Sequence, residues 1–435
     1  MDNFFKKLFN RPKKVQAKSF SYSGGPYSAQ GLFSRASSLP PKKAIEYYTN
    51  VAPLFTAINS IASEVGGLNI QLYDERSGEY LTEHEILSLL KFPNADITQF
   101  EFFTQLSSFY KLTGNVFVVA TGPINRPPLE LTAINPMNVN ITNNKDDGYI
   151  QTIEVLTDSG NSAIFTREES GSRFRYISGS DAEIWHIKSF NPYYGANNNW
   201  GFSELTPISF ELEQYLEAST HNLSLLKRGA KPSGAIKVPE GLTDSQFDRL
   251  QQQVERFYSG SQNAGRVMLM EQGDFVDMSQ SNKDMDFATL KNDITATIYS
   301  ALKVPLPLVS GDYATYNNME TAQLNFYDNC VLPVAKRLLE ELTVFLMDRY
   351  GTKFENMELR YNQEDIEALE LRRNQQLVML KESGVLSINE LRSRLGYDTI
   401  DGGDSIYVNS NQVPVGSDMT PDMVKSIGEI LDKNK

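Results

Sequence analysis

The acidic side chains come nearest to a catalytic arrangement in this sequence. Two carboxylates are adjacent at Asp146 and Asp147, and two more lie one residue apart at Asp284 and Asp286. Carboxylate oxygens in such pairs can bind Mg²⁺. Neither pair accompanies a base or a phosphate-binding loop, so solvated surface carboxylates are the favoured interpretation. A metal-dependent enzyme that acts on nucleic acid is the alternative.

The motifs that would identify a nucleotide-binding or zinc enzyme are incomplete in this chain. The glycines of GSQNAG, at residues 260–265, have the spacing of a P-loop, but Arg266 and Val267 follow where Lys and Ser or Thr are needed. HEILS, at residues 84–88, lacks the second histidine of the HExxH motif. We therefore predict no enzymatic activity, no metal and no cofactor.

The length and composition predict a globular protein of several domains. With 435 residues, of which 40% are hydrophobic, the chain can fill the cores of two or three domains. Its apolar runs are much shorter than the roughly 20 residues of a membrane-spanning helix, so no membrane association is expected. The single cysteine, Cys330, cannot form an internal disulfide. We expect it to fill space in a core, in a reducing compartment.

The charge distribution argues against a protein that grips nucleic acid. The net charge is −13, whereas nucleic-acid binders normally present a basic face. The exception is the first 20 residues, which carry six Lys and Arg against one Asp. Residues 1–40 are rich in Ser, Gly, Lys and Pro and are predicted to be a mobile basic arm. A solvated tail is the favoured interpretation, and a docking arm is the alternative.

The first half of the chain is predicted to form helices followed by a β region. Residues 44–67 predict one helix that ends at two glycines. Thr98 is expected to cap a second helix with Glu101, and Gly114 to end it. Short alternating runs between residues 129 and 187 predict a mostly antiparallel sheet.

Long amphipathic helices dominate the second half. Thr206 is expected to cap a helix that reaches about residue 229, with Ser203 as an alternative start. A compact α/β insertion follows, and a second helix from residue 282 must stop at Pro305. Asn317 is expected to cap a third long helix. Residues 364–382 predict a further helix, Ser387 with Glu390 a capping box, and residues 421–433 a final helix.

Eight stretches resemble, in order, one family: the portal proteins of tailed bacteriophages, in particular the HK97-like type. They extend from about residue 45 to 415 and therefore cover most of the chain. The stretches are LLKFPNADITQFEFFTQLSSFYKLTGNVFV, PLELTAINPMNVNI, EIWHIKSFNP, WGFSEL, FYSGSQNAGRVMLMEQG, VPLPLVSG, TYNNMETAQLNFYDNCVLP and SGVLSINELRSRLG.

The resemblance implies an α+β portal fold that assembles as a ring. After the arm, it assigns residues 41–202 to the first part of a wing. It further implies a two-helix stem, an α/β clip, a channel loop, a wing region with a long kinked helix, and a small helical crown. The corresponding residues are 203–229 and 282–304 for the stem, 230–281 for the clip, 305–317 for the channel loop, 318–380 for the second wing region and 381–435 for the crown.

The family's function is a channel at one vertex of the phage head. The resemblance implies a ring of usually twelve copies, located in the virion and assembled in the host cytoplasm. Double-stranded DNA passes through this ring during packaging and ejection. The implied partners are the large subunit of the terminase, the major capsid and scaffold proteins, and a head-tail adaptor. Another head-tail connector or adaptor protein is a second alternative, although such proteins are usually shorter.

The resemblance gives candidate roles to three groups of residues. A loop that borders DNA should contact the duplex without holding it, and residues 305–317 contain no Lys or Arg. Pro333 is expected to kink the long helix. The channel-loop candidates are Leu306, Leu308, Val309, Gly311, Asp312, Tyr313 and Tyr316. A basic cluster near the clip either faces DNA or pairs with acidic residues of the next subunit, and it comprises Lys227, Arg228, Lys231 and Lys237.

Overall fold

The structure is a computed structural model, and the residues that it describes are those treated below. They are 38–228, 234–237, 249, 274–277, 287–309 and 316–404, apart from short gaps at 82, 145–147, 158–159, 171–172, 180, 193–198, 352–353, 355, 384–385 and 395–396. The predicted basic arm, most of the predicted clip and the final helix lie outside this range. So do both carboxylate pairs considered above.

The first helical segment forms two helices where the sequence predicts one. They are α3 (Pro41–Asn50) and α4 (Ala52–Gly66), and Val51 between them has an extended backbone with φ −110°. Pro53 explains the break, because in a continuous helix its ring would clash with the carbonyl group of residue 49. The predicted end at the two glycines is confirmed, because Gly67 caps α4.

The next helices follow their capping signals. Helix α5 (Glu85–Lys91) begins after His84, whose side chain accepts a hydrogen bond from the backbone N–H of Ile86. Helix α6 (Gln99–Thr113) begins with the predicted capping box of Thr98 and Glu101, and Gly114 ends it in the left-handed region at φ 69°. The capping and the end predicted for α6 are confirmed.

A small sheet joins distant parts of the chain. Its strand order is β12-β1-β2, formed by Met357–Tyr361, Ile70–Asp74 and Glu79–Leu81, and both pairings are antiparallel. A helical side chain provides a hydrogen-bond acceptor for one backbone N–H group at the outer edge of β12. Leu359 N–H donates to Thr343 Oγ1 at 3.1 Å.

The predicted antiparallel region is a sheet of seven strands. The order is β4-β3-β9-β8-β7-β6-β5, and every pairing is antiparallel, which confirms the prediction. The strands are β3 (Asn115–Thr121), β4 (Glu130–Ile134), β5 (Val139–Asn143), β6 (Ile150–Leu156), β7 (Ser162–Ser170), β8 (Arg173–Ser178) and β9 (Ala182–Lys188).

This sheet curls back on itself. Its two edge strands are consecutive in the chain, and only the short 3₁₀ helix η2 (Pro136–Asn138) separates them. The link from Ile134 to Val139 spans at most about 18 Å, at roughly 3.6 Å per residue. Six strand spacings of about 4.8 Å would place the edges of a flat sheet about 29 Å apart. The link is therefore too short for a flat sheet.

Strand β3 belongs to two hydrophobic cores. Val116, Val118 and Ala120 face the main core, which contains the helices, while Phe117 and Val119 face a second core inside the curled sheet. All of β3 except Thr121 is buried. This explains why its sequence, NVFVVAT, reads as a continuous apolar run instead of alternating.

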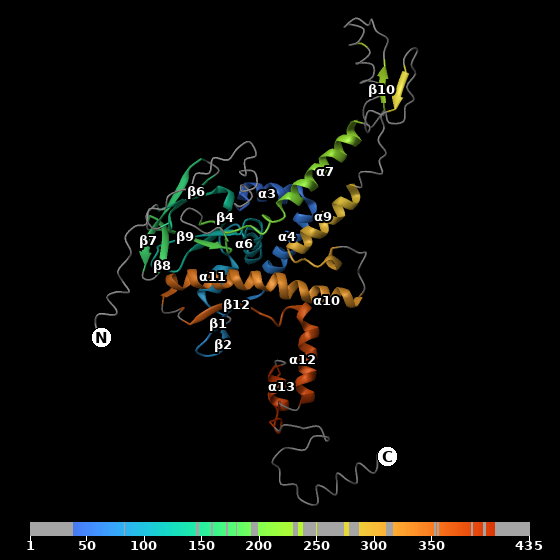
Figure 1. The fold of residues 1–435 in the computed structure, drawn as a ribbon. Coiled ribbons are helices and arrows are strands. Elements are labelled where there is room, and N and C mark those ends of the chain that lie inside the picture. Colours follow the sequence, from blue (N-terminus) through green and yellow to red (C-terminus); the bar gives the residue numbers. More distant parts are fainter. Residues whose placement is uncertain are drawn as a thin grey trace, which may run out of the picture.

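Two helices extend from the body toward a short β pair (Figure 1). They are α7 (Ser209–Arg228) and α9 (Phe287–Ala301), and the pair is β10 (Gly234–Lys237) with β11 (Asp274–Asp277). The predicted capping of α7 by Thr206 is wrong, because turns occupy residues 204–208 and the helix starts at Ser209. Thr206 instead accepts a hydrogen bond from Leu39 N–H through its side-chain oxygen.

The long helix of the second half has three parts. These are α10 (Tyr316–Phe326), a π-helical turn (Tyr327–Val331, labelled η7 below) and α11 (Leu332–Tyr350). The predicted N-cap at Asn317 is wrong, because α10 already includes Tyr316 and Asn317. The predicted helix at residues 364–382 starts later, as η9 (Glu367–Leu369) and α12 (Glu370–Ser383).

The C-terminal described segment ends in α13 (Ile388–Arg394). The predicted capping box is confirmed, because Ser387 N–H donates to Glu390 Oε2 at 2.7 Å and Glu390 N–H donates to Ser387 Oγ at 3.2 Å. Helix α12 runs away from α11 on the side opposite α7 and α9 (Figure 1).

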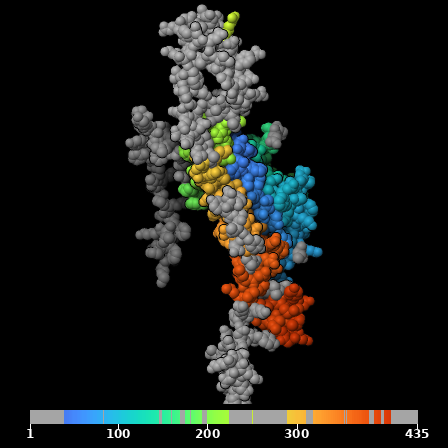
Figure 2. Space-filling view, turned by 90° about the vertical axis from the view of Figure 1, so that its right-hand side faces the viewer, coloured from blue at the N-terminus to red at the C-terminus, as the bar shows by residue number. Residues whose placement is uncertain are grey.

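The described part of the chain is elongated (Figure 1). In Figure 1 the curled sheet lies at one side, α10 and α11 cross the body, and α7 with α9 and α12 with α13 extend in opposite directions. In the view turned by 90°, the gold and orange atoms of α9 and α10 face the viewer along a narrow edge (Figure 2). No helix in the described part of the chain is long and apolar enough to cross a bilayer.

Candidate functional site

The base of the 305–317 loop is fixed by the end of α9. Val304 N–H donates to Tyr299 O at 2.8 Å and Lys303 N–H donates to Ser300 O at 3.1 Å. This is the hydrogen-bond pattern of a Schellman motif, in which a residue in the left-handed region ends the helix. Here that residue is Lys303, with φ 61°. Leu302 and Val304 on either side of it are buried.

The described half of the loop folds onto the body. Pro305 precedes the 3₁₀ helix η5 (Leu306–Leu308), and Val309 N–H donates to Leu306 O at 3.0 Å. Leu308 and Val309 pack against the main core, whereas Leu306 is 37% exposed. Of these three channel-loop candidates, Leu306 is therefore the most exposed. Gly311, Asp312, Tyr313 and the side chain of Tyr316 lie outside the described residues.

A cavity of about 490 Å³ lies beside the loop base, and we call it the loop groove. It is bounded by α4, α10, η7 and η9, and its lining includes Glu64, Val304, Val309, Phe326, Tyr327 and Glu367. The Tyr327 hydroxyl donates a short hydrogen bond to Glu64 Oε2. Burial, and then this carboxylate, raise the pKa of Tyr327.

Pro333 lies just after the π-helical turn. It is the second residue of α11, and Leu332 N–H donates to Tyr327 O, five residues earlier. Proline has no N–H to donate, and its ring would crowd the carbonyl group of residue 329 in a regular α-helix, so the wider turn relieves a local conflict. Cys330, within this turn, is buried as expected and donates to Leu302 O at 3.2 Å. Burial raises the pKa of its thiol to about 11.

The basic cluster is only partly within the described residues. Lys227 and Arg228 are the last residues of α7, and Lys237 ends β10 opposite Asp274. Lys231 lies outside the described range, as do the side chains of the other three. Both interpretations of this cluster, contact with DNA and contact with another subunit, therefore stay open as predictions.

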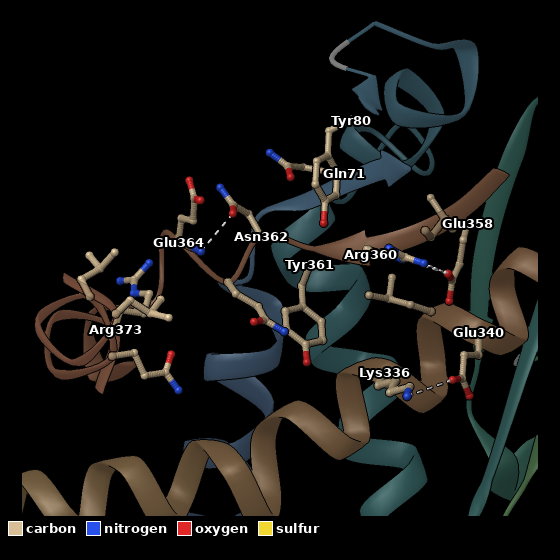
Figure 3. A pocket seen from close by; sticks show the side chains of 16 residues that line it. Gln71, Tyr80, Lys336, Glu340, Glu358, Arg360, Tyr361, Asn362, Glu364 and Arg373 are labelled. Atoms are coloured by element: carbon tan, nitrogen blue, oxygen red, sulfur yellow. Dashed lines mark hydrogen bonds and ion pairs between the residues drawn. The ribbon is translucent and has the colours of Figure 1, made fainter. Parts of the chain in front are cut away.

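A polar groove of about 850 Å³ lies between β12, α11 and α12. Figure 3 shows Tyr80, Arg360 and Glu358 on its sheet side and Lys336 with Glu340 on α11. Two ion pairs lie in its lining, since Arg360 bonds Glu358 at 2.7 Å and Lys336 lies 3.7 Å from Glu340. Within the described ranges, no group of three His, Cys, Asp or Glu side chains is placed to hold a metal ion.

A buried ion cluster joins α11 to the curled sheet, and it was not predicted from the sequence. Arg349, whose side chain is 0% exposed, lies 3.3 Å from Glu183, and Arg175 bonds the same carboxylate at 2.8 Å. Arg349 also donates to the carbonyl oxygens of Gly122, Pro123 and Arg126. The hydrogen bonds to Glu183 raise the pKa of Arg175. Residues 183 and 349 are 166 positions apart, so no local pattern could reveal the pair.

The segment before α7 is attached to the sheet through Asn115. Its Oδ1 accepts from Gly201 N–H at 2.6 Å and lies 3.0 Å from His186 Nε2. The His186 ring stacks on Phe117 with centroids 4.3 Å apart, and its Nδ1 is buried without a hydrogen-bond partner. Desolvation, assisted by Lys188, lowers the pKa of His186 to about 3. The imidazole is therefore neutral at pH 7.

This histidine predicts a pH dependence of stability. The unfolded chain takes up a proton near pH 6.5, whereas the folded chain does so only near pH 3, so stability falls as the pH falls between these values. One proton contributes up to about 1.4 kcal/mol per pH unit. Urea unfolding at pH 6 and pH 4.5 should show a steeper loss in the wild type than in His186→Gln. If both proteins lose the same stability between these two pH values, the low pKa of His186 is contradicted.

The family comparison matches most of the chain. A family model described as phage portal protein matches residues 52–396. An uncharacterized protein of Rickettsia bellii (strain RML369-C) is 28% identical over 370 residues, which cover 83% of this chain and 90% of that protein.

Two similar structures come from gene transfer agent (GTA) particles. The chain is similar to one from the neck of an empty GTA particle computed with C6 symmetry, at 27% identity and a TM-score of 0.60, covering 84% of this chain and 95% of that one. It is also similar to one from the neck of a native GTA particle computed with C12 symmetry. There the identity is 26% and the TM-score 0.57, covering 86% of this chain and 99% of that one.

Proposed function

The chain belongs to the phage portal protein family, and on this premise we propose how its parts serve a channel. It is a portal protein that forms a channel at one vertex of a virus-like head, as a ring of identical subunits located in the particle. The α+β fold agrees with the resemblance seen in the sequence. The observation that carries the proposal is the family match across residues 52–396 together with the similarity to a neck chain of C12 symmetry.

We propose that the ring contains twelve subunits and that double-stranded DNA passes through it. Its proposed partners are the terminase large subunit, the major capsid and scaffold proteins, and a head-tail adaptor, with assembly in the host cytoplasm. The protein would supply no chemistry of its own, because the energy for packaging would come from the terminase.

The parts of the chain fit this proposal as follows. Helices α7 and α9 would form the stem and β10 with β11 part of the clip, while α12 and α13 would belong to the second wing region and the crown. The narrow edge with α9 and α10 would face the channel (Figure 2). The loop at residues 305–317 connects these two helices. That loop contains no Lys or Arg, so it would let phosphates slide past it.

Electron microscopy of the purified full chain tests the ring. Averaged top views should show closed rings with a central hole, and their rotational symmetry gives the copy number. A uniform population of two-fold dimers would contradict the proposal, because a two-fold contact uses the same surface patch on both partners and cannot build a ring of twelve.

If DNA slides past the loop, Leu306→Lys should cause a salt-dependent defect in DNA packaging. Leu306 is suited to this test because it is exposed, whereas Leu308 and Val309 pack against the core. A ring of new cations would pair with phosphates, and each pair adds salt-dependent affinity. Packaging should slow several-fold at low salt and recover at high salt, while the uncharged Leu306→Gln should package normally. If Leu306→Lys packages at the wild-type rate at every salt concentration, the loop does not border the DNA.

A further inference from the structure

Lys303 has an unusual backbone for its residue type. It ends α9 in the left-handed region, at φ 61°. Glycine takes that position in a Schellman motif without steric conflict, whereas a lysine places its Cβ close to its own backbone. A residue held in such a conformation suggests that its side chain is needed there.

The Lys303 side chain is also unmatched within its own subunit. It is exposed, and its ammonium forms no ion pair or hydrogen bond within the described part of the chain. Between residues 292 and 335 it is the sole Lys or Arg of the sequence. The base of the loop therefore presents one cation to its surroundings.

The loop groove has the opposite character. Glu64 and Glu367 contribute two carboxylates to its lining, and no Lys or Arg is among the residues that line it. Glu64 accepts from the Tyr327 hydroxyl, whereas the exposed Glu367 has no ion pair or hydrogen bond within the described residues. Val304, Val309 and Phe326 supply apolar walls. Such a groove suits a lysine, whose alkyl chain is apolar and whose ammonium is charged.

The two features face different surroundings in one subunit. Val304 lines the loop groove, but the adjacent Lys303 does not. Lys303 follows Leu302, whose carbonyl oxygen accepts from the buried Cys330 thiol at 3.2 Å, and its own side chain is exposed. The groove instead opens between α4, α10 and η9.

We propose that Lys303 of one subunit enters the loop groove of the next subunit in the ring and pairs with Glu64 and Glu367. The proposal rests on the ring of the proposed function. It commits to a second copy of this chain because the cation and the acidic groove are complementary and belong to one chain. Two different patches that meet in this way form a heterologous contact, which is the kind that closes a ring. The base of each loop would thus be attached to α4 and η9 of its neighbour.

A charge exchange in the full chain tests this contact. Lys303→Glu and Glu367→Lys should each raise at least tenfold the protein concentration at which half of the chain is in rings, measured by sedimentation and electron microscopy. The double variant should return this concentration to within threefold of the wild-type value. Lys42→Glu, an exposed position on α3 with the same change in charge, should leave it unchanged.

A second variant distinguishes loss of the contact between subunits from loss of fold stability. Lys303→Gly removes the backbone conflict, so its thermal unfolding midpoint should equal or exceed that of the wild type, while ring formation should still weaken. If Lys303→Glu forms rings like the wild type, or if the double variant is no better than the worse single variant, the contact is overturned and the portal function still stands. If the wild type forms no rings, both the contact and the ring are contradicted.

Discussion

Glu183→Gln is expected to lower the free energy of unfolding by about 3 to 5 kcal/mol. The substitution keeps the shape of the side chain but removes the negative charge that neutralises Arg349, which is 0% exposed, and Arg175, which is 13% exposed. A buried guanidinium without a carboxylate loses its attraction and keeps its desolvation cost. Urea unfolding of the purified protein, followed by circular dichroism, gives the difference.

An exposed ion pair supplies the matched control. Glu358 bonds Arg360 at 2.7 Å, but their side chains are 30% and 38% exposed. Glu358→Gln should therefore cost less than about 1 kcal/mol. If Glu183→Gln does not fold, the double variant Glu183→Gln with Arg349→Met should recover expression, because it also removes the buried cation. If Glu183→Gln and Glu358→Gln lose similar small amounts of unfolding free energy, the buried cluster is not a main connection between α11 and the sheet.

Gly201→Ala is expected to destabilise the fold by about 3 kcal/mol, at the upper end of the cost of overpacking. A Cβ at this position would lie 2.0 Å from Gly114 O and 2.8 Å from Ser189 N, and both atoms belong to the backbone. The obstruction cannot be relieved by rotating a side chain. The same residue is fixed from the other side by the hydrogen bond to Asn115, so the segment leading to α7 would have to move.

Gly67→Ala is the control for Gly201→Ala. Gly67 has an ordinary helical φ of −77°, and the nearest atom to an added Cβ is 3.3 Å away. Its change in unfolding free energy should stay within about 1 kcal/mol. Thermal unfolding of the two variants at one protein concentration makes the comparison. Equal midpoints would mean that the backbone near residue 201 adjusts easily.

Sequence reasoning succeeded where the structural signal is local. The capping box of Thr98 with Glu101, the end of α6 at Gly114 and the capping box of Ser387 with Glu390 each lie within one or two turns of the chain. The alternating strands of the curled sheet also follow from a pattern of period two. The family resemblance added the ring and its channel, which no single local pattern contains.

It failed where a local signal was not used and where distant residues decide the structure. The break at Val51 was missed, although Pro53 gave a signal for it. The kink predicted at Pro333 stays a prediction, and the π-helical turn before it was not expected. Arg349 and Glu183 are 166 positions apart in the sequence and meet only in the folded state. For Lys303, the sequence ALKVP marks the end of a helix but not a left-handed lysine.

Strand β3 has a consequence for how the subunit responds to load. Its alternate side chains complete two cores, so neither the helical body nor the curled sheet keeps its packing if β3 moves. A pull on α7 reaches this strand directly, because the segment before α7 is bonded to Asn115, the first residue of β3. Both cores would then resist the pull together, and mechanical unfolding of this region should occur as one cooperative event.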